Sequence, residues 1–406
     1  MRALPSPELL AELSAILPAD RLLTDELSLT TYECDGLTLY RQLPMVVVIP
    51  ETVEQVQAIM RVSHRRGIPV VPRGAGTGLC AGAMPHSEGI LLSLTALDSI
   101  LAVEPDNQLA RVQPGVTNLA ISEAAEHFGL FYAPDPSSQV ACSIGGNVAE
   151  NSGGVHCLKY GLTVNNVLAV TLVTVEGDLL EFGGAGLDSP GPDLLALING
   201  SEGLLGLVVE ITVRLLPRPA ATAVVMAGFD AVRPAGDAVG AIIASGILPA
   251  GLEMMDALAI QAAEDFAGAG YPRDAAALLL CELDGNAAEV AEQVTLCERL
   301  LSDAGASSIA TANDPVEQAR LWRGRKSAFP AVGRISRDYY CMDGTIPRSR
   351  IADVLEEIGR LSQHYDLAVA NVFHAGDGNL HPLILFDASD PLQVQRAEEF
   401  GAAILE

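Results

Sequence analysis

Two histidines near the end of the chain are spaced so that they could share a ligand. His374 and His381 lie within Asn371-Val-Phe-His-Ala-Gly-Asp-Gly-Asn-Leu-His381, where two apolar runs flank Gly376-Asp-Gly378, a hairpin-turn signal. Across such a hairpin the two side chains would stand near-opposite on one face, with Cβ atoms about 5 Å apart. Both imidazoles could then reach one divalent ion. The alternative, one packed and one exposed histidine, needs no ligand.

A cluster of positive charge lies upstream of these histidines. Residues 320–337 hold six of the 24 lysines and arginines in a chain whose formal net charge is −27. A small anionic substrate, repelled by the acidic surface, would need such a locally basic site, and a guanidinium binds a carboxylate through two hydrogen bonds. The alternative is a solvated helix face paired with the surplus acids, which we expect for most of the six. They are Arg320, Arg323, Arg325, Lys326, Arg334 and Arg337.

The N-terminal half contains three glycine-rich stretches. The first, Pro72-Arg-Gly-Ala-Gly-Thr-Gly-Leu79, follows an apolar run, and glycines there let backbone N–H groups approach a phosphate or pyrophosphate. It is not a P-loop, because no Gly-Lys-Ser/Thr follows. It is not the GxGxxG dinucleotide fingerprint either, because the third glycine comes one residue early. Taken alone, this stretch could equally be a tight exposed turn.

The second stretch covers residues 134–154 and is dense in Gly, Ser and Asn. It contains Pro134-Asp-Pro-Ser-Ser138, Cys142-Ser-Ile-Gly-Gly-Asn147 and Asn151-Ser-Gly-Gly154, and the third stretch is Gly200-Ser-Glu-Gly203. Such segments offer many N–H and O–H donors and little side-chain bulk. A long surface loop is the alternative, but long structureless loops in compact domains are uncommon unless they are functional. We therefore expect backbone wrapped against a large polar ligand.

The pattern of expected helices and strands changes at Pro217-Arg-Pro219, which we take as a domain boundary. Before it, residues 45–72 are typical of a βαβ unit, with a capping box at Thr52 and Gln55 and a helix end at Gly67. Further strands are expected at 90–94, 110–113, 130–132, 167–175, 179–182 and 207–216, with a helix at 117–128.

Beyond the boundary, alanine-rich helical patterns alternate with apolar strands. This arrangement predicts an α+β domain with helices on one face of a sheet. The expected helices are 230–245, 286–304, 314–328, 349–364 and 391–405, and the expected strands are 223–229, 276–283, 338–346, 367–374 and 380–386.

Length and composition narrow the classes of function. The 406 residues suggest two or three domains at roughly 150 residues each. The excess of 51 acidic over 24 basic residues argues against binding nucleic acid or an anionic lipid surface. Seven scattered cysteines favour reduced thiols in a cytoplasm-like compartment. The longest charge-free apolar stretch, residues 238–252, is shorter than the ~20 residues that span a bilayer, so a soluble protein is expected.

The order of these motifs resembles the FAD-binding domain of the vanillyl-alcohol oxidase/PCMH flavoprotein superfamily. Within it, the chain resembles the family of FAD-binding D subunits of bacterial glycolate oxidase (glycolate dehydrogenase), from about residue 20 to the last residue. The resemblance implies an α+β fold with a PCMH-type two-subdomain FAD-binding domain over 45–219, after an N-terminal helical segment over 1–44. An α+β cap (substrate) domain with an antiparallel sheet, of the FAD-linked oxidase C-terminal type, would follow over 220–406.

The resemblance also implies which residues hold FAD. Residues 73–79 would cradle the pyrophosphate, and some relatives attach FAD covalently through a histidine in this loop. The loop contains no histidine here, so we expect non-covalent FAD. The motifs between 134 and 154 would line the adenosine and flavin path, and the remaining residues would lie near the adenine end. The implied cofactor-binding residues are Arg73, Gly74, Ala75, Gly76, Thr77, Gly78, Leu79, Pro134, Ser137, Ser138, Cys142, Gly145, Gly146, Asn147, Asn151, Gly153, Gly154, Glu202, Val208 and Ile211.

For the reaction, the resemblance implies oxidation of a small 2-hydroxy acid, glycolate or D-lactate, to the 2-oxo acid. Arg325, in the motif Trp322–Arg325, would bind the substrate carboxylate, and His374 and His381 would be catalytic as ligands of a divalent metal (Zn, Mn or Fe). One alternative is another D-2-hydroxy-acid dehydrogenase, for D-lactate or D-2-hydroxyglutarate. The other is a non-catalytic flavin-binding subunit that relays electrons.

The family continues with a Gly-Glu-His-Gly segment, which is implied to supply a further metal ligand and the general base. The sequence stops at Glu406 before such a segment, so we expect a C-terminally truncated chain. Electrons would pass to flavin and iron–sulfur partner subunits of a glycolate oxidase complex or to a quinone. The expected location is the cytoplasm, or the periphery of the inner membrane through partners, with no transmembrane segment in the chain and no nucleic acid bound.

Overall fold

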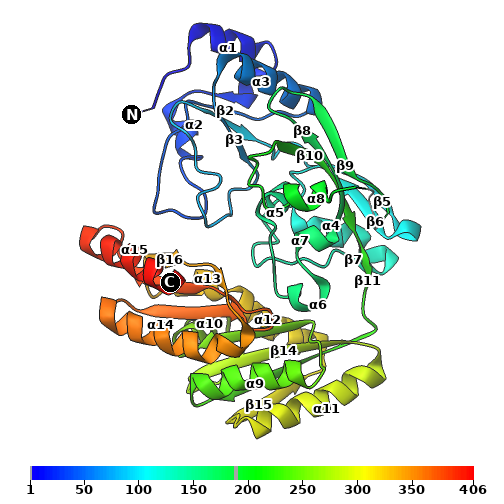
Figure 1. The fold of residues 1–406 in the computed structure, drawn as a ribbon, viewed down its shortest axis with the longest axis vertical. Helices are drawn as coiled ribbons and strands as arrows, with labels where there is room; N and C mark the ends of the chain where they lie inside the picture. The colour runs from blue at the N-terminus through cyan, green and yellow to red at the C-terminus, as the bar shows by residue number, and fades with distance from the viewer. Residues whose placement is uncertain (1, 187–190) are drawn as a thin grey trace. The chain divides into compact units, whose positions relative to one another are not determined.

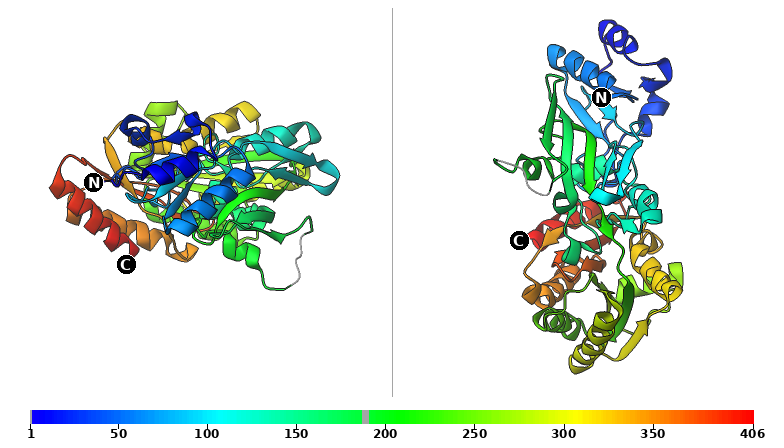
Figure 2. Two further views of the ribbon diagram at one scale, coloured as in Figure 1. Left: turned by 90° about the horizontal axis from the view of Figure 1, so that it is seen from above. Right: turned by 90° about the vertical axis from the view of Figure 1, so that its right-hand side faces the viewer.

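The structure is a computed structural model that describes residues 2–186 and 191–406. The chain forms two compact units, traced in Figures 1 and 2. The first contains Met1–Gly154 and Gly161–Arg218, and the second contains Val155–Tyr160 and Pro219–Glu406. A short segment that interrupts the first unit in the sequence is therefore part of the second.

The first unit contains a four-stranded sheet whose strand β3 leads into the first glycine-rich stretch. Its order is β1–β2–β4–β3, with the last three strands parallel. The predicted βαβ unit is confirmed, because α3 begins at a capping box of Thr52 and Gln55 and ends at Gly67 with φ of 63°. The elements are β1 (Leu22–Leu23), β2 (Val46–Val48), α3 (Val53–Arg66), β3 (Val70–Arg73) and β4 (Ile90–Ser93).

A five-stranded antiparallel sheet completes the core of this unit, in the order β5–β6–β10–β8–β9. Along β10, buried and half-buried residues alternate, as expected for a strand with one face in the core. The predicted strands of this sheet are confirmed with shifts of one or two residues. These are β6 (Leu109–Val112), β8 (Val167–Val173), β9 (Leu179–Gly183) and β10 (Leu207–Arg214). The fifth strand, β5 (Ile100–Glu104), was not predicted from the sequence pattern.

The second glycine-rich stretch is partly helical rather than an extended loop. Its α5 (Ile144–Glu150) begins at Ser143, whose Oγ accepts a hydrogen bond from the amide of Gly146 at 3.3 Å. The other short elements are α1 (Pro7–Ser14), α2 (Glu26–Thr30), α4 (Asn118–Ala125), β7 (Leu130–Phe131), α7 (Thr163–Asn166), α8 (Leu194–Ile198), β11 (Leu216–Pro217) and the 3₁₀ turns Ala19–Arg21, Pro105–Asn107 and Glu126–Phe128.

The second unit is built on one antiparallel sheet in the order β15–β12–β14–β13–β18–β19–β17, with β20 pairing β18 and β16. Its strands are β12 (Ala221–Phe229), β13 (Gly251–Asp256), β14 (Ala277–Gly285), β15 (Ser308–Ala312), β16 (Asp338–Cys341), β17 (Gly344–Thr345), β18 (Val369–His374), β19 (Asn379–Leu380) and β20 (Pro382–Phe386). Its helices are α6 (Cys157–Tyr160), α9 (Val232–Ala244), α10 (Ala257–Ala267), α11 (Ala287–Asp303), α12 (Pro315–Lys326), α13 (Ala328–Val332), α14 (Ile351–Tyr365) and α15 (Pro391–Leu405), with a 3₁₀ turn at Arg348–Arg350.

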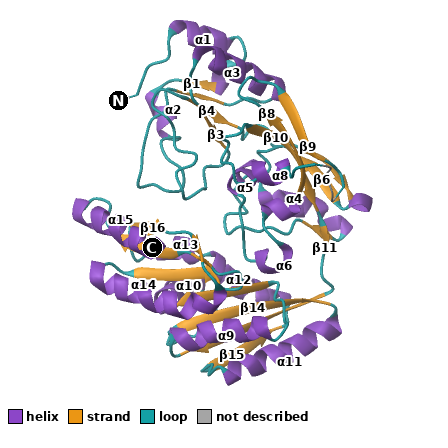
Figure 3. Ribbon diagram, in the orientation of Figure 1, coloured by secondary structure: helices purple, strands orange, loops and turns teal. Residues whose placement is uncertain are grey.

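Helices cover both faces of this sheet, so the expectation of helices on one face is wrong (Figure 3). Neighbouring residues of a strand point to opposite faces. In β14, Leu280 packs in a cluster with Ile260 of α10 and Leu321 of α12, whereas the next residue, Cys281, contacts Cys297 of α11. A strand that is buried on both faces has a continuous apolar sequence, and that sequence does not show where the covering helices lie.

Two further features of the second unit differ from the sequence-based expectations. The pattern between 246 and 275 predicts no element, yet this region forms β13 and α10 at the centre of the unit. The strand predicted at 338–346 is divided into β16 and β17, which pair with different strands. In the part of the chain that the structure describes, no helix is both long and apolar enough to cross a bilayer.

Helix α6 is held in the second unit by two acids of β14. Asp284, which is 4% exposed, accepts hydrogen bonds from Lys159 and from the hydroxyl of Tyr160. Glu282 accepts one from the indole of Trp322, and its other oxygen lies 3.2 Å from His156 Nε2. Polar contacts therefore fasten the interrupting segment to the sheet.

Candidate functional site

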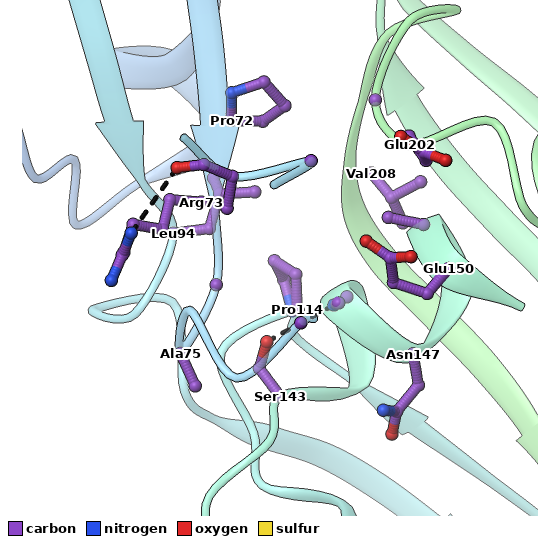
Figure 4. Close-up of a pocket in the computed structure, with 18 of the residues that line it drawn as sticks. Pro72, Arg73, Ala75, Leu94, Pro114, Ser143, Asn147, Glu150, Glu202 and Val208 are labelled. Carbon is purple, nitrogen blue, oxygen red and sulfur yellow. Dashed lines mark hydrogen bonds between the residues drawn. The ribbon is translucent and has the colours of Figure 1, made fainter. Parts of the chain in front are cut away.

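The first unit contains a cavity at the ends of β3 and α5, lined by all three glycine-rich stretches. Figure 4 shows Arg73 and Leu94 on one side of it and Glu150, Glu202 and Val208 on the other. Residues distant in sequence thus meet around one cavity.

Most of the implied cofactor-binding residues line this cavity. The lining includes Arg73, Gly74, Ala75, Gly76, Thr77, Gly78, Ser138, Cys142, Gly145, Gly146, Asn147, Glu202 and Val208, whereas Leu79, Pro134, Ser137, Asn151, Gly153, Gly154 and Ile211 are not part of it. Sequence reasoning missed Leu94, Pro114, Ser143 and Glu150, which also line it. Of these, only Ser143 carried a usable signal, because serine is one of the residues preferred at a helix N-cap.

The loop at 74–79 fits a pyrophosphate. Within the described residues, none of its amides donates a hydrogen bond to the protein, so these N–H groups are available to an anion. The backbone is closely packed behind the cavity, since a Cβ at Gly145 would lie 2.5 Å from Pro114 Cβ and one at Gly74 would lie 2.1 Å from Ser143 Oγ. Small residues and unpaired donors are what a close-fitting dinucleotide such as FAD needs.

Arg73 has a structural contact as well as a place in the cavity wall. Its Nη1 donates to the carbonyl of Cys34 at 2.7 Å and to that of Ala83 at 3.4 Å, and its guanidinium lies 5.7 Å from the centre of the Tyr32 ring. The side chain therefore ties the first glycine-rich stretch to the segment that precedes β2.

The opposite wall is acidic. Glu150 and Glu202 both line the cavity, and Cys80 Sγ lies 3.3 Å from Glu150 Oε2. Partial burial raises the pKa of the Glu150 carboxyl, and Glu202 adds to the rise. Burial likewise raises the pKa of the Cys80 thiol to about 11. These groups suit hydrogen bonds with amino or hydroxyl groups of a ligand rather than contact with phosphates.

The second unit contains a buried polar cluster around Glu253 of β13, which sequence reasoning missed. Its Oε1 lies 2.7 Å from His374 Nδ1 and its Oε2 lies 2.6 Å from Arg325 Nη2, and both Glu253 and Arg325 are 1% exposed. Burial opposes ionisation of Glu253, but His374 and Arg325 outweigh it and lower the pKa of the carboxyl. The available signal was a single acid inside the apolar run of residues 252–255.

Arg325 differs from the other members of the basic cluster. Arg320, Arg323, Arg334 and Arg337 are exposed and Lys326 is half-buried, as expected for a solvated helix face. Arg325 is buried, and its Nε and Nη1 have no hydrogen-bond partner in the described structure. A buried donor left unpaired costs about 1–3 kcal/mol. The guanidinium therefore keeps two donor nitrogens that no acceptor of the described protein satisfies.

His374 and His381 share one face, as predicted, but are diagonal rather than opposite neighbours. The strand register pairs His374 with Asn379, which places His381 two residues further along. Their ring centroids are 5.1 Å apart and their planes nearly perpendicular. Burial, with the nearby His374 and Arg325, holds the pKa of His381 well below its usual range, so this imidazole is neutral.

This geometry fits two ligands of one ion. With metal–nitrogen bonds of about 2 Å, each ring centroid would lie about 3 Å from the ion, which gives a centroid separation near 5 Å. Among the residues that the structure describes, three potential ligands converge only at Cys80, Glu150 and Glu202, an exposed acidic group of a kind that is common without an ion. The histidine pair thus offers two of the ligands that an ion would need.

Comparisons with known families identify the family of both parts of the chain. Residues 44–183 match the family described as "FAD binding domain" and residues 218–406 match "FAD linked oxidases, C-terminal domain". The chain belongs to the family of FAD-linked oxidases and is a flavin-dependent oxidoreductase. The expected FAD-binding domain and the expected FAD-linked oxidase domain are confirmed.

Three relatives are similar to this chain along most of its length. It is 58% identical to glycolate oxidase subunit GlcD of Escherichia coli (strain K12), over 100% of this chain and 82% of the relative. It is 37% identical to glycolate oxidase subunit GlcD of Bacillus subtilis (strain 168), over 92% and 80%. It is 33% identical to a D-lactate dehydrogenase of Archaeoglobus fulgidus, over 84% and 75%.

Solved structures confirm the fold class. Alkyldihydroxyacetonephosphate synthase matches with a TM-score of 0.82 at 18% identity, over 100% of this chain and 81% of that one. 4-Ethylphenol oxidase from Gulosibacter chungangensis matches with 0.81 at 16%, over 99% and 88%. p-Cresol methylhydroxylase matches with 0.79 at 18%, over 97% and 85%. At these identities the likeness concerns the fold alone, which is of the PCMH type.

Proposed function

We propose that the protein oxidises a small 2-hydroxy acid, glycolate in the first place, to the 2-oxo acid with non-covalently bound FAD. The observation that carries this proposal is the buried guanidinium of Arg325, whose Nε and Nη1 lack partners beside a pair of histidines. A carboxylate supplies the negative charge and the acceptor oxygens that buried guanidinium donors require. The names of the glycolate oxidase relatives support the choice of substrate class.

In this proposal each side chain has a defined task. Arg325 holds the substrate carboxylate, and the neutral imidazole of His381 with that of His374 holds a divalent ion (Zn, Mn or Fe). Such an ion lowers the pKa of a hydroxyl group bound to it. Oxidation removes the hydroxyl proton and a hydride from the adjacent carbon, and FAD supplies the redox chemistry when it is bound. Because Arg325 is 1% exposed, the surrounding side chains must move to admit the substrate.

The proposal is tested by two spectra. The purified protein is expected to be yellow, and anaerobic addition of glycolate should bleach the flavin band. A colourless protein would contradict FAD binding in the cavity. A yellow protein that neither glycolate nor D-lactate bleaches would contradict the substrate class, whatever its metal content.

A second substrate is favoured by the D-lactate dehydrogenases among the relatives. D-Lactate and D-2-hydroxyglutarate carry the same 2-hydroxy carboxylate, so Arg325 would hold them in the same way. Rates of flavin bleaching with the three acids rank them directly. A non-catalytic relay subunit is the remaining alternative, and it predicts no bleaching by any of them and no bound divalent ion.

The relatives are named as subunits, so we also propose that the protein works in a complex. Flavin and iron–sulfur partner subunits, or a quinone, would take electrons from the reduced flavin. The proposed location is the cytoplasm, with peripheral attachment to the inner membrane through such partners. Affinity purification of the tagged protein from its own host, with iron analysis of the eluate, tests the partner directly.

A further inference from the structure

Glu253 contacts both halves of the proposed substrate site, Arg325 and His374. It lies on β13, where the strand register sets it directly opposite His374 of β18. One of its oxygens faces His374 Nδ1 at 2.7 Å, and the other faces Arg325 Nη2 at 2.6 Å. Because Glu253 is 1% exposed, bulk water does not compete for either oxygen.

The contact with His374 decides which ring nitrogen can bind an ion. An ionised carboxylate only accepts hydrogen bonds, so the Nδ1 that faces it carries a hydrogen. The lone pair of the neutral ring is then on Nε2, on the side away from Glu253. A carboxylate behind a metal-binding histidine is a known way of orienting the ring and raising its basicity.

The contact with Arg325 decides which donors remain free. Nη2 forms an ion pair with Glu253 Oε2, whereas Nε and Nη1 have no hydrogen-bond partner among the described residues. The Nε–H points to the Nη2 side of the guanidinium, so Nε and Nη1 are two separate donors and not one two-donor edge. Glu253 thus faces Nη2, the nitrogen common to both two-donor edges, and leaves Nε and Nη1 for single hydrogen bonds to a ligand.

We propose that Glu253 is a positioning residue that couples the metal ligand to the substrate clamp, holding His374 with Nε2 free and Arg325 with Nε and Nη1 free. This inference rests on the proposed function and extends it. Both neighbours of Glu253 are donors, so only a side chain with two acceptor oxygens satisfies both. A glutamine of the same shape offers one acceptor and one donor and satisfies only one of them.

A simpler reading is that Glu253 only neutralises the buried Arg325. That reading predicts a loss of stability in Glu253→Gln without a specific loss of metal affinity. A matched control is Asp284→Asn, which removes another buried acid. Asp284 lies on the neighbouring strand β14 and pairs with Lys159 of α6. Both variants should unfold at lower temperature, so stability alone does not separate the readings, and metal affinity does.

The experiment measures Zn²⁺ binding by equilibrium dialysis and elemental analysis, together with flavin content and steady-state kinetics on glycolate. We expect Glu253→Gln to bind Zn²⁺ about 10–100-fold more weakly than the wild-type protein, in line with other outer-shell partners of metal ligands. Its KM for glycolate should also rise, with flavin content unchanged. Glu253→Asp keeps two acceptor oxygens and should recover part of the Zn²⁺ affinity. Asp284→Asn should bind Zn²⁺ as the wild type does.

The outcomes separate this inference from the function on which it rests. Wild-type Zn²⁺ affinity in folded Glu253→Gln, or an equal loss in Asp284→Asn, overturns the positioning role even if glycolate bleaches the flavin. Failure of 2-hydroxy acids to bleach the wild-type flavin overturns the proposed substrate, whereas a specific loss of Zn²⁺ affinity in Glu253→Gln would still support the positioning of His374. A wild-type protein that binds no Zn²⁺ overturns the coupling.

Discussion

Arg325 and Gly145 illustrate how single residues limit what the two units can bind. The guanidinium of Arg325 is buried with two nitrogens unpaired, so a ligand that fills both positions recovers the cost of the unpaired donors as binding energy. Gly145 has no room for a side chain, because Pro114 packs against its Cα. At Arg325 the protein supplies no acceptor for two donor nitrogens, and at Gly145 it leaves no room for a side chain.

Arg325→Lys should raise the KM for glycolate by at least about tenfold, the equivalent of ~1.4 kcal/mol, because an ammonium is a point charge without the planar fork. Flavin content should not change, since Arg325 belongs to the second unit and the cavity to the first. Initial rates over a range of glycolate concentrations give the KM. Arg323→Lys is the control, because Arg323 is exposed on the same helix. Equal effects of the two changes would refute the role of Arg325.

Gly145→Ala should lower both stability and flavin content. The new Cβ would lie 2.5 Å from Pro114 Cβ and 3.0 Å from its carbonyl oxygen, so the chain must shift, at a cost of about 1–3 kcal/mol. The ratio of absorbance at the flavin band to that at 280 nm reports flavin content, and a thermal melt reports stability. Gly184→Ala has open space around its Cβ and should behave as the wild type. Full flavin content in Gly145→Ala would show that the cavity wall yields more easily than its packing indicates.

At the scale of elements, local patterns predicted what local interactions determine. As expected, α3 begins at the capping box of Thr52 and Gln55 and ends at the left-handed Gly67. Also as expected, a turn that ends at Gly378 separates the two histidines. These features depend on residues a few positions apart. The sequence therefore identified the hairpin and the glycine loops without knowledge of the rest of the fold.

Features that depend on distant pairing were not predictable in the same way. β13 pairs with β14 and β18, which lie far away in the sequence, and no local pattern marks Glu253 as the partner of His374. The same is true of the register that makes His381 a diagonal neighbour of His374 and of the second layer of helices. The acid that joins Arg325 to His374 was missed because its role exists only after the sheet has formed.

Gly359 offers a test of how far helix propensity still matters within such a sheet-based unit. It is exposed in the interior of α14, and a Cβ there would meet nothing within 4 Å. Gly359→Ala should raise the free energy of unfolding by about 0.5–1 kcal/mol, because glycine loses more backbone entropy on folding than alanine. Urea unfolding followed by circular dichroism measures the change. A decrease in stability would mean that this helix tolerates glycine for a reason that the packing does not reveal.

At the scale of the whole molecule, the two units are interleaved along the chain. Val155–Tyr160 belongs to the second unit, although the residues on both sides of it belong to the first. Lys159 and Tyr160 contact Asp284, which is nearly fully buried. The two units are therefore joined through this segment as well as through the connection between β11 and β12.

A protease site inserted at residues 218–220, between β11 and β12, should leave the two fragments associated after cleavage. The N-terminal fragment would still contribute α6 to the second unit, held there by Asp284 and Glu282. Size-exclusion chromatography of the cleaved protein, without denaturant, should show one peak that contains both fragments. Asp284→Asn should promote their separation, because it leaves Lys159 without its buried partner. Separation of the fragments in the wild-type background would contradict this role of α6.

The same interleaving sets an order of events during synthesis. Helix α6 leaves the ribosome before any strand of the sheet that holds it, and Asp284 follows about 120 residues later. At about 5–20 residues per second, that interval is roughly 6–25 s. Until Asp284 has been made, Lys159 lacks the acid with which it pairs in the folded protein, so α6 can join the second unit only after that delay.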